Sequence, residues 1–419
     1  MINHNLHFQG KKLLVLGATK FLAEVVKEAK FYGAYVVVVD YNNESPAKKI
    51  ADESLLCDVM DVDKIVDYIN INNIDGVITG FTDSLLSPYL KICKKANLPC
   101  YLSDQSLKFT TDKQYFKKLC KKFKIPVVPE YEIADSNKKY PLIIKPVDNS
   151  GARGISICKS LNEFNTCLQY SLSWSKSKKV LIEDYIDSNE ATVFYLFQDG
   201  QYHLTAMGDR HVINIKDNTI KLPTGYTFPS KGLEKFQLNL DDKFKQLFKY
   251  LNLYDGMMFI QGFIDKDHNF IPYECGYRLT GSFEYNIIDK CCGFNPMLMC
   301  VNHALTGKMS FSSIKKYVEP NFKTKAYNIS LLIKPGKISK IQGVDELKNV
   351  SNIIFMFQSY ESGDEIDETQ WGKLSQVFLR VLFVAESDKQ YAATIEKLNQ
   401  INVFDPEGKD LLINKKIIK

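Results

Sequence analysis

The chain has 419 residues, of which 45% are hydrophobic, and its 54 basic and 49 acidic residues give a formal net charge of +5. A chain of this length exceeds what one hydrophobic core usually holds, so we expect two to four domains of ordinary globular composition. Lysines are interspersed with acidic residues, and no stretch approaches the roughly 20 apolar residues of a membrane-spanning helix. Residues 1–5 lack the features of a signal peptide. We therefore expect a cytoplasmic protein without a nucleic-acid or membrane partner.

The cysteines and histidines offer no metal-binding spacing. Ten cysteines form no CxxC pair, and the adjacent Cys291 and Cys292 are poorly placed to chelate one metal together. The six histidines are equally dispersed. We expect reduced, buried thiols and no zinc site.

The first hundred residues alternate strand and helix signals. Apolar, β-branched runs at 12–16 and 35–40 flank an amphipathic segment at 24–30. This pattern is typical of a parallel sheet that is covered on both faces.

The turn at 17–22 lies where a dinucleotide-binding fold places its phosphate loop, and Asp40 ends the second strand about 20 residues later. The second and third glycines of GxGxxG are absent. A dinucleotide oxidoreductase is therefore an alternative that this turn alone supports. We prefer a small α/β domain that uses its strand ends for another ligand.

Residues 257–275 carry the most informative pattern, two apolar segments around a polar loop, which predicts a β-hairpin. If Asp265 pairs with Phe270, Gln261 lies directly opposite Glu274. Cross-strand partners on one face have Cβ atoms about 5 Å apart. An amide oxygen and a carboxylate at that separation can bind one hard cation.

Side chains alternate along a strand, so Gly276 and Arg278 continue on the face of Glu274. This face presents two oxygen ligands, a gap and a guanidinium. The set suits a nucleoside triphosphate, because Mg²⁺ bridges phosphate oxygens and arginine binds the transferred group. For the segment taken alone, an ordinary hairpin with solvent-exposed polar side chains is the alternative.

Candidate phosphate-binding residues precede the hairpin. Residues 111–113 begin a lysine-rich helix that we expect to end before Pro126. An apolar strand then ends in Lys145, a residue that needs an anionic partner. The glycine-containing loop 146–154 can lay its backbone amides against phosphates as a flexible lid, although a simple surface loop is the alternative.

The remaining segments are less specific. Residues 180–186 predict a strand that ends in a turn, with Glu190 just after it. Residues 207–231 predict a long, irregular polar loop, and long loops inside compact domains are commonly functional. Strand signals and a helix at 389–400 follow residue 312.

Taken in order, these pieces resemble the ATP-grasp superfamily over about residues 11–310. The pieces are Asp112-Lys113, the strand ending in Lys145, the glycine loop through Gly154, the segment 182–186, Glu190, Gln261 and the run 274–278.

The resemblance implies a mixed α/β and α+β fold. An amino-terminal, parallel-sheet domain (the pre-ATP-grasp domain) would span 1–108. A two-part ATP-grasp domain would span 109–311, with a lid subdomain at about 138–185. A small carboxy-terminal α+β unit would span 312–419.

The resemblance also implies an ATP site. Phosphates would contact Lys113 and Lys145 beneath the glycine loop, backbone groups of 184–186 would hold the adenine, and Glu190 the ribose hydroxyls. The implied nucleotide-binding set is Lys113, Lys145, Ser150, Gly151, Gly154, Glu183, Asp184, Tyr185, Ile186 and Glu190.

Gln261 and Glu274 would be the ligands of Mg²⁺, or of Mn²⁺ in its place, with the glutamine resembling carbamoyl-phosphate synthetases. The superfamily usually has an asparagine two residues after the second carboxylate, where this chain has Gly276. This departure puts the second metal, and with it turnover, in question.

The implied catalytic residues are Arg278, Lys145 and Arg210. Arg278 would steady the transferred phosphoryl group and the acyl phosphate. Arg210, with its neighbours Asp209 and His211, would lie near the acceptor substrate.

The function that the resemblance implies is an ATP-dependent carboxylate–amine ligase that forms an amide through an acyl phosphate. Its partners would be a small-molecule carboxylate and an amine, and a homodimer is left open. The alternatives are a bicarbonate-activating carboxylase of the same fold and a non-catalytic ATP-binding sensor. The carboxylase fits less well, because 279–282 lack the charged residues expected there in biotin carboxylases. Gly276 is the support for the sensor.

Overall fold

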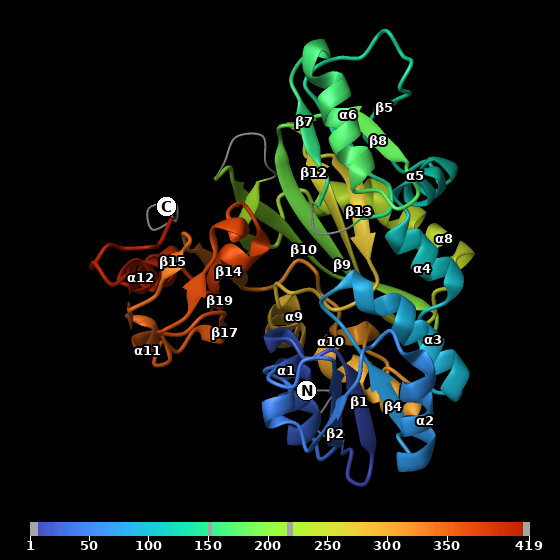
Figure 1. Ribbon diagram of the computed structural model, residues 1–419, viewed down its shortest axis with the longest axis vertical. Coiled ribbons are helices and arrows are strands. Elements are labelled where there is room, and N and C mark those ends of the chain that lie inside the picture. Colours follow the sequence, from blue (N-terminus) through green and yellow to red (C-terminus); the bar gives the residue numbers. More distant parts are fainter. Residues whose placement is uncertain (1–6, 150–152, 216–220, 414–419) are drawn as a thin grey trace.

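The computed structural model describes residues 7–149, 153–215 and 221–413, so Ser150 and Gly151 of the predicted glycine loop lie outside the described residues. The amino-terminal sheet and the small unit formed by residues 130–149 and 153–184, called the lid after its predicted role, lie at opposite ends of the molecule, with a large antiparallel sheet between them (Figure 1). The predicted mixture of a parallel α/β domain and an antiparallel sheet is confirmed.

The amino-terminal sheet is parallel, with strand order β3-β2-β1-β4. Its apolar central strands are buried because helices pack on both faces, as the continuous β-branched runs predict. Its strands are β1 (Lys12–Leu16), β2 (Tyr35–Asp40), β3 (Glu53–Leu56) and β4 (Gly76–Ile78). The helices of this part are α1 (Lys20–Phe31), α2 (Val62–Asn72), α3 (Leu86–Ala96) and α4 (Asp104–Thr111).

The lid has its own four-stranded sheet, with order β5-β8-β6-β7, and a small core of its own beneath α6. Its strands are β5 (Glu130–Tyr131), β6 (Leu142–Pro146), β7 (Ser156–Cys158) and β8 (Val180–Asp184). The helices beside it are α5 (Lys113–Lys122) and α6 (Phe164–Ser173). Helix α5 ends before Pro126, as predicted, and its amino terminus is capped by Asp112, which accepts from the Tyr115 amide.

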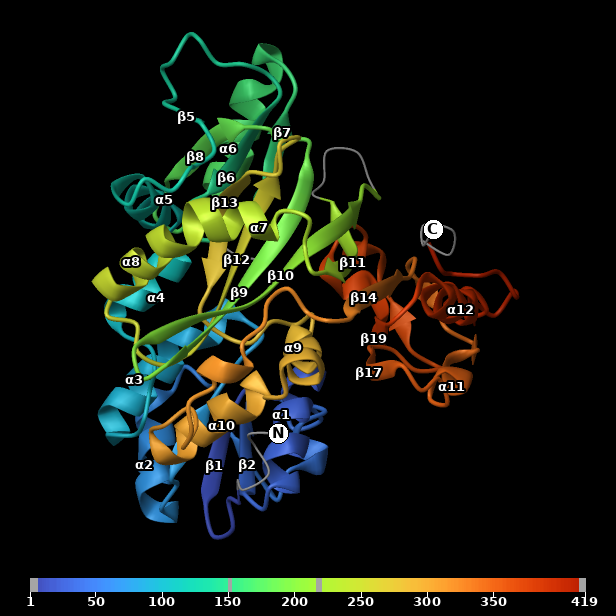
Figure 2. The same cartoon turned by 180° about the vertical axis from the view of Figure 1, so that it is seen from behind.

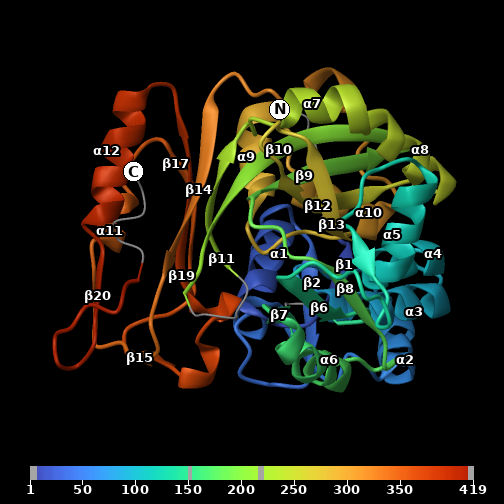
Figure 3. The same cartoon turned by 90° about the horizontal axis from the view of Figure 1, so that it is seen from above.

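One eight-stranded antiparallel sheet, with order β13-β12-β9-β10-β11-β14-β19-β17, continues into the carboxy-terminal part of the chain. Figure 3 shows β14, β17 and β19 beside β11, with α12 on their outer side. The strands are β9 (Asn189–Gln198), β10 (Gln201–Ile213), β11 (Leu222–Phe228), β12 (Gly256–Ile264), β13 (Phe270–Gly276), β14 (Lys325–Leu332), β17 (Ile353–Gln358) and β19 (Val377–Ala385).

The helices near this sheet cover its faces and join it to the amino-terminal part, where α9 and α10 lie next to α1 (Figure 2). They are α7 (Leu233–Phe236), α8 (Asp242–Tyr250), α9 (Glu284–Cys292), α10 (Pro296–Thr306), α11 (Val344–Leu347) and α12 (Asp388–Asn399). Four short strands complete the carboxy-terminal part: β15 (Gly336–Lys337), β16 (Lys340–Gln342), β18 (Glu365–Ile366) and β20 (Asn402–Phe404).

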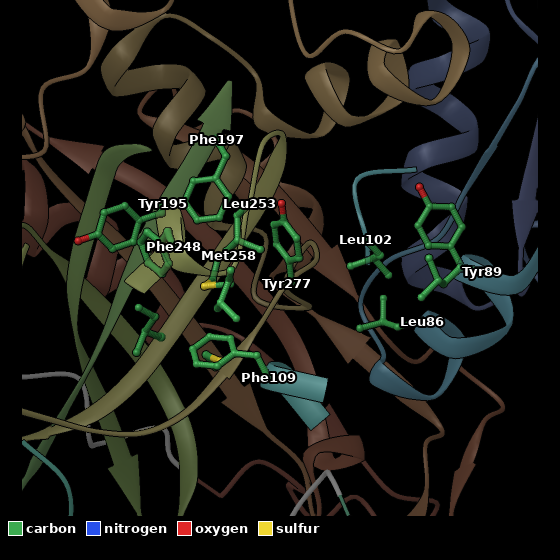
Figure 4. Close-up of a cluster of buried hydrophobic side chains, with 14 of the residues drawn as sticks. Leu86, Tyr89, Leu102, Phe109, Tyr195, Phe197, Phe248, Leu253, Met258 and Tyr277 are labelled. Atoms are coloured by element: carbon green, nitrogen blue, oxygen red, sulfur yellow. The ribbon is translucent and has the colours of Figure 1, made fainter. Parts of the chain in front are cut away.

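A continuous apolar core locks the amino-terminal part to the large sheet. Figure 4 shows Tyr195 and Phe197 of β9 packed near Phe248 and Met258, with Tyr277 beside them. An aromatic chain extends this core toward α3, because the ring of Tyr101 lies 5.1 Å from Tyr277 and 5.9 Å from Tyr89. The sheet that carries the site is therefore fixed to the amino-terminal domain by buried aromatic contacts.

The prediction of an irregular loop at 207–231 is wrong for most of this segment, because parts of β10 and β11 lie within it and pair with each other. The strand pattern is hidden in the sequence by a register shift after His211 and by Gly225. A Cβ at Gly225 would lie 2.2 Å from the backbone oxygen of Asn328 on β14, so close strand packing requires glycine there.

The predicted hairpin is present, and Gln261 lies opposite Glu274 as predicted. The predicted pairing of Asp265 with Phe270 is wrong, because Ile264 pairs with Phe270 and the Asp265 amide bonds to Asn269 in a tighter turn. A β-bulge after Gln261 shifts the register by one residue and restores the expected partner.

Among the residues that the structure describes, no helix combines the length and the apolar character needed to cross a membrane.

Candidate active site

A cavity of about 1020 Å³ lies where the amino-terminal domain, the lid, the large sheet and the carboxy-terminal strands meet. Ligand sites commonly enclose roughly 300–1000 Å³, so this cavity can hold a nucleotide and a second small molecule. The predicted residues that line it are Lys113, Arg210, Gln261, Glu274 and Arg278. Lys145, Glu183–Ile186 and Glu190 do not line it.

Gln261 and Glu274 line the cavity as cross-strand partners. Neither side chain has an ion pair or a hydrogen bond with another described residue, whereas most carboxylates around the cavity are paired. Their oxygen atoms are therefore available to a ligand. Two such oxygen donors, one charged and one neutral, are suited to a hard cation.

Arg278 is fixed by a residue that the sequence did not reveal. Its Nε and Nη2 donate to the two oxygens of Asp83 at 2.6 and 3.0 Å, a bidentate ion pair. Asp83 belongs to the amino-terminal domain, almost 200 positions earlier, and no local motif marks it. The Phe81 amide also bonds to the Leu279 carbonyl at 3.1 Å, which holds this loop beside Arg278.

Gly276 is explained by its cross-strand partner. A Cβ there would lie 2.4 Å from the ring of Phe259, which pairs with Gly276 across β12 and β13. The same ring lies 5.1 Å from the Arg278 guanidinium carbon, in a cation–π contact. An aromatic ring therefore covers the backbone where the superfamily usually carries its asparagine.

Lys113 is the first residue of α5, and its Nζ donates to the Asn149 backbone oxygen at 2.5 Å. Burial lowers the pKa of Lys113, an effect that Glu274 opposes and Lys145 reinforces. The predicted phosphate-binding lysines are thus near enough to repel each other. Such repulsion is relieved by a bound polyanion.

Lys145 lies on β6, and its anionic partner in this structure is Glu183 of β8, at 2.5 Å. The same carboxylate accepts from Lys117 of α5 at 2.7 Å, and all three side chains are buried. Burial acts to raise the pKa of Glu183, but the two lysine charges outweigh it and lower the pKa. Sequence analysis placed Glu183 in the nucleotide-binding set and missed Lys117.

Two backbone amides just after Glu183 already donate hydrogen bonds within the protein. The amides of Asp184 and Tyr185 donate to the carbonyls of Pro129 and Pro141 at 3.1 and 3.2 Å. A ligand at these two residues would therefore meet their carbonyl groups.

Gly154 adopts a left-handed conformation, with φ +80°, and its position is packed against Trp174. A side chain could not be accommodated there, because a Cβ would lie 2.4 Å from that of Trp174.

Arg210 of β10 is half-buried and forms an ion pair with Glu190, which also accepts from the Tyr273 hydroxyl at 3.1 Å. Its Nε has no hydrogen-bond partner among the described residues. Arg210 lines the cavity, whereas Asp209 and His211 alternate away from it and bond to Ser230 and Thr227.

Two further buried charges line the cavity, and sequence analysis missed both. Arg380 lies on β19 and donates to the Ser330 hydroxyl at 2.9 Å. Glu284 begins α9, and one of its oxygens accepts from the Thr280 hydroxyl. Neither lies in a recognisable motif; only the burial of a charged residue in the folded structure reveals them.

The sequence from the lid to the start of α9 matches a known family model, the ATP-grasp domain, over residues 138–284. This segment of the chain carries an ATP-grasp domain. The formate-dependent phosphoribosylglycinamide formyltransferase of Bacillus subtilis is 25% identical over 190 residues, which are 43% of this chain and 49% of the relative. The chain thus spans about half the length of the curated relatives it matches.

The fold is similar to solved structures over nearly the whole chain. The L-amino acid ligase of Bacillus licheniformis superposes with a TM-score of 0.76, at 20% identity, over 95% of this chain and 99% of that one. The biotin carboxylase domain of a Hydrogenobacter thermophilus 2-oxoglutarate carboxylase, in complex with MgADP and bicarbonate, gives a TM-score of 0.75. It is 14% identical and covers 97% of this chain and 92% of that one. At these identities the likeness shows the fold.

Proposed function

We propose that this protein is an ATP-dependent ligase that joins a carboxylate to an amine through an acyl phosphate. The observation that carries the proposal is the face shared by β12 and β13, with the segment after β13, which brings Gln261, Glu274 and Arg278 to one cavity. Carboxylate oxygen is a poor leaving group and phosphate is a good one. Transfer of the terminal phosphoryl group of ATP to the carboxylate therefore makes displacement by an amine possible.

Lys113 and Lys145 would bind the ATP phosphates, the second by exchanging part of its interaction with Glu183 for a phosphate oxygen. The Asp184–Ile186 segment would hold the base through backbone carbonyls, and the glycine loop around Gly154 would lie over the phosphates. Glu190 would hold the ribose only if its ion pair with Arg210 rearranges.

Gln261 and Glu274 fit Mg²⁺, because both present oxygen atoms that are not committed to the protein. When bound, Mg²⁺ neutralises phosphate charge and orients the transferred group. Arg278, held by Asp83 and by the Phe259 ring, would bind the transferred phosphoryl oxygens. Its fixed orientation means that little reorganisation is needed at the moment of transfer.

A non-catalytic ATP sensor is the second candidate, and one observation favours it. The ring of Phe259 covers Gly276, so no side chain there can supply the usual further oxygen ligand. A hydrated Mg²⁺ tolerates missing protein ligands, which is why we place the ligase first. A bicarbonate-activating carboxylase shares the fold and the ATP chemistry, but the acid that ATP activates would be bicarbonate instead of an organic carboxylate.

The test is ADP release from ATP and Mg²⁺ with amino acids and uronic acids, singly and in pairs, in the presence and absence of hydroxylamine. A ligase will release ADP when its carboxylate is added, and hydroxylamine will trap that acid as a hydroxamate. Bicarbonate-dependent ADP release without an organic hydroxamate identifies the carboxylase. ATP binding without acid-stimulated release across the panel identifies the sensor.

A further inference from the structure

Two buried charges of opposite sign line the cavity without forming an ion pair with each other. Arg380 is 6% exposed and Glu284 is 1% exposed. They are close enough for each charge to act on the other's pKa. Leaving such charges without a counter-charge is unfavourable in a protein interior, because burial removes the water that would solvate them. The cost implies a partner that is supplied from outside the chain.

Arg380 has unused capacity on the cavity side. Its guanidinium carries five N–H donors. Within the described residues it donates to the Ser330 hydroxyl, and no carboxylate forms an ion pair with it. Strand pairing places Ser330 and Phe357 directly beside Arg380, so all three side chains share one face of the sheet. A carboxylate is the ligand that matches this planar donor.

Glu284 likewise has one carboxylate oxygen that is free to accept a hydrogen bond. One carboxylate oxygen accepts from Thr280, and the other, Oε1, has no partner among the described residues. Burial raises the pKa of Glu284, while the Thr280 and Ser282 hydroxyls and the charge of Arg380 act in the opposite direction. The amino terminus of α9 accounts for a negative charge at this position but leaves Oε1 unsatisfied. An ammonium group would satisfy it.

The wall beside these charges is aromatic. The rings of Phe21, Phe81 and Phe357 line the cavity, and Phe21 stacks on Phe357 at 4.7 Å. Phe81 adopts φ +67°, which is costly for a bulky residue and holds its ring toward Phe21 at 5.9 Å. An apolar side chain of a ligand would be desolvated against these rings.

We propose that Arg380 and Glu284 together bind one zwitterion, an α-amino acid with an apolar or aromatic side chain, which is one of the two organic substrates. Arg380 binds its carboxylate, Glu284 its ammonium group, and the wall of Phe21, Phe81 and Phe357 its side chain. A ligand with a single charge would leave one of the two protein charges buried and unpaired. That this zwitterion is a substrate rests on the proposed ligase function, whereas its binding to Arg380 and Glu284 does not.

The test is calorimetric titration of the full chain, with Mg²⁺ and a non-hydrolysable ATP analogue present, by three matched probes. L-Phenylalanine carries both charges, L-phenylalaninamide lacks the carboxylate, and 3-phenylpropionate lacks the ammonium group. We expect wild type to bind L-phenylalanine at least about 10-fold more tightly than either analogue, in line with the strength of charged hydrogen bonds. L-Leucine is the second amino acid.

Two variants assign the contacts. Arg380→Met should weaken L-phenylalanine about 10- to 100-fold and leave L-phenylalaninamide within about 3-fold. Glu284→Gln, which preserves shape, should weaken L-phenylalanine similarly and leave 3-phenylpropionate unchanged. Binding of the ATP analogue reports the fold, and Arg380→Lys replaces the methionine variant if that variant does not fold; its smaller loss should again spare the amide.

Equal losses for all three probes in either variant would show a structural role and overturn the proposal. So would the absence of binding by both L-phenylalanine and L-leucine while the ATP analogue binds. Neither result depends on turnover, so this binding test can be interpreted even if the ligase assay fails.

Discussion

The lid and the cavity differ in how their buried charged residues are paired. In the lid, Glu183 lies between Lys117 and Lys145, and every charge of this buried group has a partner within the protein. At the cavity, Glu274 has no ion-pair or hydrogen-bond partner among the described residues, and within the same residues Glu284 and Arg380 are buried without an ion pair. Paired charges specify how a small subdomain packs, whereas unpaired charges are retained for a ligand. Changes in the lid should therefore affect stability first, and changes at the cavity should affect function first.

The largest expected effect comes from Glu274→Ala. Removing the uncommitted carboxylate should lower Mg²⁺-dependent ADP formation at least about 1000-fold, because a metal ligand and its charge are lost together. The melting temperature should stay within a few degrees of wild type, since no protein partner is orphaned. Asp267→Ala, in the exposed turn of the same hairpin, is the matched control and should be fully active. Wild-type ADP formation in Glu274→Ala would remove the metal assignment.

The lid should respond in the reverse manner. Glu183→Ala leaves Lys145 buried without a counter-charge, while Lys117 keeps a second partner in Glu130 at 3.1 Å. We expect a loss of about 3–5 kcal/mol in the free energy of unfolding, measured by urea denaturation. Adding Lys145→Met to Glu183→Leu should recover much of the stability while ATP binding weakens. An unchanged unfolding free energy in Glu183→Ala would abolish the contrast between the two regions.

Gly276→Asn tests whether packing, rather than chemistry, excludes the usual ligand. The new side chain must displace the Phe259 ring, at a cost of about 1–3 kcal/mol in the free energy of unfolding. Phe259→Ala in the same chain should relieve most of that cost and allow the asparagine to approach the metal. If Gly276→Asn alone is as stable as wild type, the ring does not determine the glycine.

Asp83→Asn should disturb Arg278 without removing it. Loss of the charged, two-pronged contact should lower kcat about 10-fold and change the KM for ATP less, because Arg278 would still bind but with a looser orientation. Ser84→Ala, on the same loop and also at the cavity wall, is the control. A selective rise in KM with unchanged kcat would mean that Asp83 serves nucleotide binding instead.

The smallest effect is a pH dependence. The pKa of Glu183 is lower in the folded state than in the unfolded chain, so its ionisation stabilises the fold above the unfolded value, near 4.5, and this contribution is lost as pH falls through the lower folded value. Wild type should therefore lose unfolding free energy below about pH 4.5 more steeply than Glu183→Gln. Parallel curves for the two proteins in that range would contradict the pKa assignment.

The sequence was most informative where chemistry is local. Gln261 and Glu274 are opposite each other because a period of two residues and a short turn nearly determine the pairing, although the bulge that restores the register was not foreseen. Lys145 was recognised as needing an anion, and the structure supplies Glu183. Strand alternation predicts Arg278 on the face of Glu274, and both residues line the cavity.

Sequence reasoning failed where partners come from distant segments. Asp83 is joined to Arg278 by the docking of two domains, and Arg380 reaches the cavity because the carboxy-terminal strands extend the large sheet. The ring that covers Gly276 belongs to a cross-strand neighbour whose size, not its pattern, matters. Such contacts depend on three-dimensional packing, which single-sequence periodicity does not encode.

The central claim is that ATP activates an organic carboxylate by phosphorylation in this cavity. Its most direct test is the fate of oxygen. With the carboxylate found by the ADP-release screen labelled with ¹⁸O in both oxygens, turnover with the amine should place one labelled oxygen in the released phosphate, because the bond that breaks lies between the acyl carbon and that oxygen. Phosphate that carries no label, with amide formed at the normal rate, would contradict the acyl-phosphate mechanism.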